Sequence, residues 1–499
     1  MEATYQRELG PSAKTIETHG EYRLPDYAGD IKKMLSSRAR ILPTGKFFTD
    51  ETVEFGGSVY YDFWYLDAEN KLTHESFGSD YSFSCPRGSA ADGGIDVVLT
   101  QLSLRPSGPR RVSAKATLEG RITLRESCPL HFSCEEEARV YKKEREITVG
   151  TRIFSPPMER EYAETIPVPA ALGDQDAEVI FSEAQPMIER CEAQQGGVRC
   201  SGSIVCAAVL VSKGLAPVRI CERFPFEETV ACEDAVQGSL ASADMHLTSL
   251  TVQLHMDGEP RVTFSMICEL SAVCEKNSTL SVVEDAFVGG CDSRLTCECI
   301  AFDTFLGRET FRHEMEVRIP LCEDGETAAD GVFYTGVVLK DPTLSAGTFS
   351  AEAEVTALVY ALGEEGRITY GVKAGTAPIS FALPQGAAPD GCEATLSAPA
   401  LFADAALCDE GLSVTLSLQL TVSYVQKQEV SVAKGICACP RDDAERIPYF
   451  ALHYPTEGES PWSVAKHYAV SPDALALSAR TDAESGAVTL PSPILIDCR

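Results

Sequence analysis

The chain repeats one order of predicted strands three times, and this recurrence constrains its fold more than any other feature. Each copy opens on a short segment that ends in proline, continues into an apolar hairpin, and closes on a strand of alternating apolar and polar residues. The openings end at Pro25, Pro167 and Pro320. They recur about every 140 to 155 residues, which is the size of a domain and not of a solenoid repeat. We therefore expect three similar antiparallel β domains in tandem, with few short helices.

The strands of each copy are predicted from the side-chain pattern. Aromatic and aliphatic residues dominate the first strand of each hairpin, as is typical of β structure. The closing strands alternate apolar and polar residues, which indicates one face on a core and one toward water. A short helix is also expected after Pro25, with Asp30 as its N-cap. The predicted strands are 53–66, 197–211 and 349–360 in the hairpins, and 110–118, 260–268 and 412–422 at the closing positions.

The last fifty residues follow a different pattern. A run of aromatic and aliphatic residues over 449–454 predicts a strand. Ser460 is a candidate N-cap, and Pro461 then falls at the first helical position, where its missing N–H costs nothing. The same cap-then-proline start recurs at Ser471 and Pro472, and residues 494–496 predict a closing strand. The block therefore reads as a small strand–helix–helix–strand α+β unit.

Charge and composition exclude several classes of function. The 499 residues carry a net charge of −31, which disfavours a nucleic-acid surface and direct adhesion to anionic lipid. The polar N-terminal residues lack the apolar core of a secretory signal, and no apolar stretch is long enough to span a bilayer. We therefore expect the protein to remain in the compartment where it is made. Its 19 cysteines are then most simply reduced thiols.

The sequence carries no strong catalytic motif. It lacks a Walker loop, a nucleophile elbow and a paired-histidine zinc helix, and its eight histidines are dispersed. The tight cysteine pairs at 297 and 299 and at 437 and 439 lack the spacing of a zinc site. We expect neither an enzyme, nor a cofactor, nor a bound metal.

Two resemblances rest on these patterns. The segment from Leu24 to Leu35, the strand over 53–66 and the strand over 110–116 look like SPOCS domains, which occur in spore-forming Clostridia. The run from Gly458 to Tyr468, followed by Val470 and Ser471, resembles a LysM module. Three SPOCS-like repeats followed by one LysM-like module are similar to the SipL-like family of SpoIVA-interacting spore-coat proteins. The resemblance predicts SPOCS-like domains over 1–155, 156–303 and 304–440, and a LysM-like module over 446–499.

The resemblance also implies a function. It implies a non-enzymatic scaffold or adaptor for endospore coat assembly, with the cortex as a further setting, in the mother-cell cytoplasm at the forespore surface. The LysM-like module would dock to a protein partner, a SpoIVA-like coat ATPase. The residues implied for the partner or for a glycan are Gly458, Glu459, Ser460, Trp462, Ser463, Lys466, Tyr468, Ser471, Pro472 and Leu475.

An alternative is a cell-wall or spore-wall protein that binds peptidoglycan, because most LysM modules bind N-acetylglucosamine polymers. The missing export signal and the many cysteines count against this alternative. So does the missing asparagine that LysM modules usually carry after the second helix, where the chain reads Leu477 to Asp482. Trp462 has two interpretations, an aromatic contact for a ligand or a core residue of a small domain, and its helical spacing to Ala465 favours the core.

Overall fold

The computed structural model shows a mainly-β protein, with 80% of its residues in strands and 3% in helices. The mainly-β prediction is therefore confirmed. No helix among the residues below is long and apolar enough to cross a membrane. The residues that the structure describes are 3–134, 139–169, 172, 176–320, 329–345, 347–363, 367–382, 393–396, 400–408, 411–439, 449–456, 459–476, 480–481, 488–490 and 492–497.

Residues 3–130 build two antiparallel three-stranded sheets that face each other. One sheet has the order β1-β6-β5 and the other the order β2-β3-β4. Their facing sides enclose one core, which contains Tyr61, Phe63 and Val112. These strands are β1 Ala3–Arg23, β2 Ile31–Phe48, β3 Thr52–Asp67, β4 Leu72–Pro86, β5 Asp92–Gly108 and β6 Arg111–Leu130.

The next part of the chain repeats this strand order. The strands β10-β11-β12 form one sheet. In the facing sheet, β9 and β13 pair with β14, and β8 pairs with the C-terminal half of β14. Their core contains Val198, Phe264 and Leu270. The bounds are β7 Ser133–Cys134, β8 Val140–Phe154, β9 Met158–Pro167, β10 Glu178–Gln194, β11 Gly197–Val211, β12 Val218–Ala231, β13 Leu240–His255 and β14 Arg261–Val288.

A third pair of sheets follows with the same order. The sheet β16-β17-β18 faces a sheet in which β15, β19, β20 and the short β7 pair with β21. Leu416, Phe349 and Val355 lie in the core between them. The bounds are β15 Asp292–Pro320, β16 Gly331–Ser345, β17 Thr348–Leu362, β18 Ile368–Ala382, β19 Glu393–Leu396, β20 Ala400–Cys408 and β21 Gly411–Cys439.

All six strands predicted from side-chain patterns are confirmed. The hairpin strands correspond to β3, β11 and β17, and the closing strands correspond to parts of β6, β14 and β21, with β6 and β14 beginning one residue later than predicted. The helix predicted after Pro25 is wrong. Residues after Asp30 form β2, because pairing with the buried strand β3 outweighs their local helical preference. Asp30 accepts a hydrogen bond from Arg110 instead of capping a helix.

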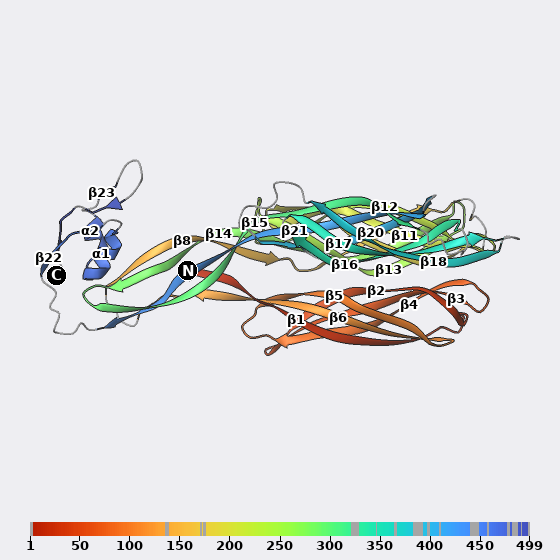
Figure 1. The fold of residues 1–499 in the computed structure, drawn as a ribbon, viewed down its shortest axis with the longest axis horizontal. Coiled ribbons are helices and arrows are strands. Elements are labelled where there is room, and N and C mark those ends of the chain that lie inside the picture. The colour runs from red at the N-terminus through yellow and green to blue at the C-terminus, as the bar shows by residue number, and fades with distance from the viewer. Residues whose placement is uncertain are drawn as a thin grey trace.

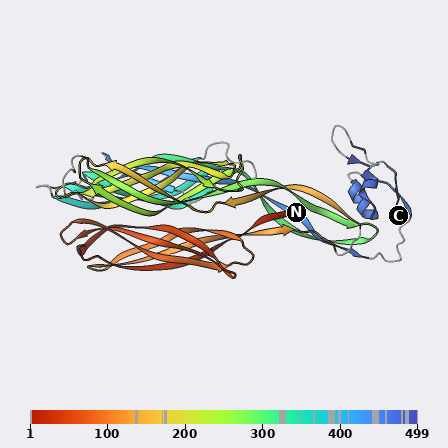
Figure 2. The same ribbon diagram turned by 180° about the vertical axis from the view of Figure 1, so that it is seen from behind.

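Some strands extend far beyond their cores. Figures 1 and 2 show β1–β6 as one elongated body beside a larger one, and show β8, β14, β15 and β21 narrowing toward the C-terminal elements. A separate cluster with Tyr5, Ile300 and Val430 fills this extension. β15 runs without a break through residues 303 and 304, where the sequence places a domain boundary, and β8 pairs with β14. The four predicted domain ranges stay a prediction.

Three of the sheets meet one another at a shared junction. Trp64 of β3 lies 5.2 Å from Phe181 of β10 and 5.3 Å from Tyr334 of β16, measured between ring centroids. Arg38 of β2 extends over the rings of Phe181 and Tyr334 and binds Glu183 of β10 at 3.0 Å. This junction joins the hairpin sheets of all three sheet pairs.

The C-terminal module comprises the described residues within 449–497. Two strands, β22 and β25, pair antiparallel, and two short helices lie between them in sequence. The predicted strand, helix, helix and strand are therefore all present, with one additional small hairpin after the helices. The bounds are β22 Phe450–His453, α1 Pro461–Tyr468, α2 Pro472–Ala476, β23 Arg480–Thr481, β24 Val488–Thr489 and β25 Ile494–Asp497.

Candidate functional site

Helix α1 begins as the sequence predicts. Ser460 is its N-cap, and Pro461 occupies the first helical turn. The backbone N–H of Ser463 donates to the Ser460 hydroxyl at 3.1 Å, and the backbone N–H of Ser460 donates to the Ser463 hydroxyl at 3.0 Å. This reciprocal pair satisfies two N–H groups that a helix start otherwise leaves unpaired. Both serines implied for ligand binding thus have a structural role at the helix start.

Glu459 and Tyr468 are joined through His453 at the end of β22. The Glu459 carboxylate lies 3.1 Å from His453 Nε2, and the Tyr468 hydroxyl lies 3.2 Å from His453 Nδ1. Because an ionised carboxylate only accepts, His453 donates to Glu459 through Nε2. Glu459 also accepts from the backbone N–H of Thr456, and this bond, followed by that from His453, lowers the pKa of Glu459. The three side chains fix β22 against the C-terminal end of α1.

Trp462 and Lys466 point out of the module toward β14. The indole Nε1 of Trp462 donates to Asp285 Oδ2 at 2.8 Å, and Lys466 Nζ donates to Asp285 Oδ1 at 2.6 Å. Burial raises the pKa of Asp285, but the hydrogen bonds from Lys466 and Trp462 outweigh burial and lower it below its usual value. These two side chains therefore contact another part of the same chain.

The remaining predicted residues lie in or beside the small core of the module. Leu475 is buried there with Val464 and Ala465, and Ser471 and Pro472 are half-buried at the start of α2. Gly458 lies outside the described residues, as do residues 477–479 and Asp482, where the LysM asparagine is expected. The structure thus brings the other nine predicted residues into one module, on or near α1 and α2.

The module also carries an exposed apolar surface that was not predicted. Leu452 and Leu495 lie opposite each other on the outward side of β22 and β25, and are 54% and 66% exposed. Phe450 and Tyr454 are also exposed, two residues to either side of Leu452, whereas Ile494 and Ile496 face the core. We call Phe450, Leu452, Tyr454 and Leu495 the outer face. The alternation of these large residues with Ala451 and His453 is the sequence signal that indicates it.

Two residues of β14 contact the module, and neither was predicted to do so. Phe287 is buried in the same cluster as Val464, and its ring centroid lies 5.1 Å from that of Trp462. Asp285 and Phe287 precede α1 by more than 170 residues, so no local pattern connects them with it. This contact is visible only in the folded chain.

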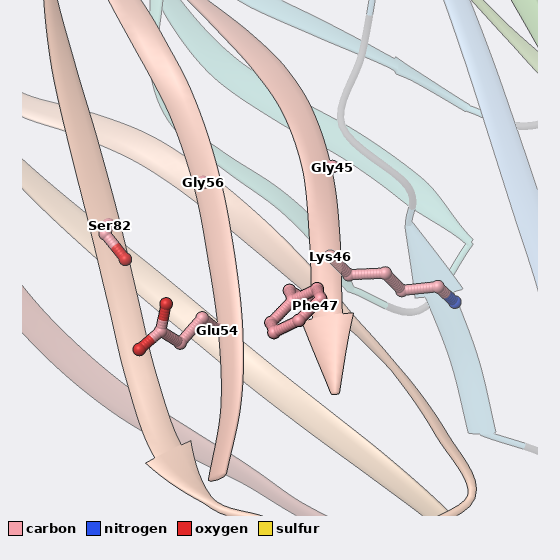
Figure 3. Close-up of a pocket in the computed structure, with 6 residues that line it drawn as sticks. All are labelled: Gly45, Lys46, Phe47, Glu54, Gly56 and Ser82. Atoms are coloured by element: carbon pink, nitrogen blue, oxygen red, sulfur yellow. The ribbon is translucent and has the colours of Figure 1, made fainter. Parts of the chain in front are cut away.

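A hollow also lies on the sheet β2-β3-β4. This hollow has a volume of about 340 Å³ and is lined by Gly45, Gly56, Glu54 and Ser82. The Lys46 side chain points away from Glu54 (Figure 3). Lys46 instead pairs with Asp92, and the polar side chains that line the hollow include those of Ser82 and Glu54. No three metal-ligating side chains come together among the described residues.

The two tight cysteine motifs lie on paired strands but do not meet. Cys437 is opposite Arg294 and Cys297 is opposite Ala433 in the β15–β21 ladder. Three residues of extended chain therefore separate Cys437 from Cys297, roughly 10 Å along the strand. Cys297, Cys299 and Cys437 are exposed thiols.

Comparison with known proteins assigns no family to the chain. No protein-family model matches it, and a search of curated proteins finds no match.

Proposed function

We propose that the protein is a non-enzymatic scaffold that docks to a spore morphogenetic protein, a SpoIVA-like coat ATPase, through its C-terminal module. The observation that carries this proposal is the outer face of β22 and β25. It places Leu452 and Leu495 opposite each other, with Phe450 and Tyr454 two residues to either side of Leu452, and all four large side chains are at least 50% exposed. Clustered apolar surface of this kind is typical of binding sites. A module at one end of an elongated β assembly also suits an adaptor that spaces two partners (Figure 1).

The geometry favours a protein partner over a glycan. Leu452 and Leu495 are aliphatic and present no hydrogen-bond groups, whereas a sugar ring needs several polar contacts beside an aromatic one. Ser460 and Ser463, the hydroxyls implied by the LysM resemblance, are used by each other at the start of α1. The proposed function therefore rests on apolar contact, and the SPOCS-like units would serve as spacers or as further contact surfaces.

The test is a direct binding measurement between the full chain and the purified coat ATPase of the same sporulating cell. Leu452→Glu and Leu495→Glu each place a charge in the centre of the outer face, and we expect each to weaken binding at least about tenfold, a loss of about 1.4 kcal/mol or more. Val338→Glu is the matched control, because Val338 is 53% exposed but lies on β16. Binding that survives both outer-face substitutions would refute this surface.

A second measurement separates the two classes of ligand. Purified full-length protein is sedimented with peptidoglycan, with and without Leu452→Glu. The scaffold proposal predicts that the protein stays in the supernatant. Strong pelleting of the unaltered chain, combined with no binding to the coat ATPase, would replace the scaffold with the wall-binding alternative.

A further inference from the structure

The module is joined to the end of the β8–β14 ladder by three kinds of contact. The first is apolar: Phe287 of β14 is only 1% exposed and packs edge-on against Trp462, with the centroids 5.1 Å apart. Tyr141 of β8 lies opposite Phe287 in the strand register and packs against it at 5.2 Å. Phe287 thus belongs both to β14 and to the core of the module.

The second contact is the Asp285 carboxylate, which uses both oxygens. One accepts from the Trp462 indole and the other from the Lys466 ammonium. Trp462 and Lys466 are one helical turn apart, so they present their donors on the same side of α1. A single carboxylate therefore fixes the helix at two points and restricts its rotation.

The third contact involves the end of the helix. Ala469 is the C-cap of α1, in the left-handed conformation with φ 54°. Its carbonyl accepts a hydrogen bond of 2.9 Å from the backbone N–H of Gly290, in the turn after β14. Carbonyls at a helix end lack partners within the helix, and here one of them is satisfied by another element.

We propose that Asp285 is a positioning residue, which fixes the C-terminal module to β14 in one orientation and so determines where the outer face points. Figure 1 shows α1 on the side of the module nearest β8 and β14, and β22 on the opposite side. Separation of the module would expose Phe287 and leave Asp285 without both donors. The contact is therefore a fixed joint, and Trp462 and Lys466 belong to it.

This proposal goes beyond the scaffold function and is testable without a partner. Carbodiimide, which couples a carboxylate to an adjacent amine, is applied to the full chain, and the products are mapped by mass spectrometry. We expect coupling of Lys466 to Asp285. The pair Lys143–Glu284, with an N···O distance of 2.9 Å, is the internal control, because Glu284 neighbours Asp285 but pairs with β8.

The second test compares Asp285→Ala with its matched control, Glu284→Gln. The measurement is acrylamide quenching of tryptophan fluorescence. The other tryptophan, Trp64, is only 2% exposed, so the quenched fraction reports Trp462. We expect about a twofold rise in the quenching constant for Asp285→Ala, a smaller rise for Asp285→Asn, which keeps an acceptor for the indole, and none for Glu284→Gln.

Two results would overturn the proposal. One is absence of the Lys466–Asp285 product while the Lys143–Glu284 product forms. The other is unchanged quenching in Asp285→Ala. The thermal transition of the β sheets, followed by far-ultraviolet circular dichroism, should be the same in all four proteins. A positioning role leaves it unmoved, whereas general loss of stability would lower it.

Discussion

Asp62→Ala tests whether the junction of the three hairpin sheets depends on one buried carboxylate. The Asp62 side chain is 3% exposed. Its carboxylate accepts hydrogen bonds from Arg40 Nε at 2.9 Å and from Arg38 Nε at 3.2 Å. Arg38 continues across the junction to Glu183 of β10. Alanine would leave Arg38 between the aromatic rings of Phe181 and Tyr334 with one carboxylate in place of two.

The expected loss follows from what remains after the substitution. Removing one partner of a buried ion pair costs about 3 to 5 kcal/mol. We expect a loss near the lower end of this range, because Arg38 keeps its ion pair with Glu183 and the partly exposed Arg40 can turn to water. With a urea slope of about 2 kcal/mol per M, a loss of about 3 kcal/mol lowers the midpoint by about 1.5 M.

The assay is the emission of Trp64, which is buried in this junction. A Trp462→Phe background leaves Trp64 as the single tryptophan of the chain. Its emission shifts to the red in urea as the junction opens. The control is Asp80→Ala, because Asp80 hydrogen-bonds Ser58 at an exposed position of the same sheet. Equal midpoints for the two variants would refute the role assigned to Asp62.

Three further predictions concern single contacts. Ser460→Ala removes the N-cap of α1 and should destabilise the module by about 1 kcal/mol, seen as faster amide exchange in the helix. The contacts in the joint lower the pKa of Asp285, so its stabilisation of the joint is complete above its ordinary pKa of about 3.9. This stabilisation is lost as the pH falls through the lowered value. Acrylamide quenching of Trp462 should therefore rise only in acid. Cys191 and Cys200 lie directly opposite each other on β10 and β11, at a Cα separation of about 4.5 to 5.5 Å that permits a disulfide. Diamide should therefore link them, as peptide mapping would detect, and failure to link them while the chain stays folded would contradict this geometry.

Local patterns were sufficient to predict most of the strands. The runs at Tyr60–Leu66, Ile204–Val211 and Val355–Tyr360 are apolar with little alternation. The structure explains why: Phe63 faces the core of its own sheet pair, whereas Trp64 faces the junction. Strands buried on both faces lose the alternation of half-buried ones. The same runs therefore contained evidence for contact between the sheet pairs, which the sequence analysis interpreted only as strands.

Contacts between distant segments could not be predicted in this way. The helix expected after Pro25 competes with pairing to β3, and pairing wins because it completes a three-stranded sheet. Arg110, 80 residues after Asp30, holds the turn between β1 and β2 by donating to the carbonyls of Pro25 and Ala28 and to the Asp30 carboxylate. Neither partner carries a local signal for the other, since the turn contains no distinctive spacing.

The position of Trp462 shows how a correct local prediction can lead to an incomplete functional one. Helical spacing correctly placed Trp462 on α1, and the choice then lay between a ligand contact and the core of a small domain. The indole instead packs on Phe287 and donates to Asp285, so it joins the module to the rest of the chain. If this joint is fixed, the proposed partner would bind where the module remains exposed, and Leu452 and Leu495 lie on that surface. Substitutions at Trp462 would then reduce partner binding by changing the orientation of the module, whereas those at Leu452 would do so by removing contact.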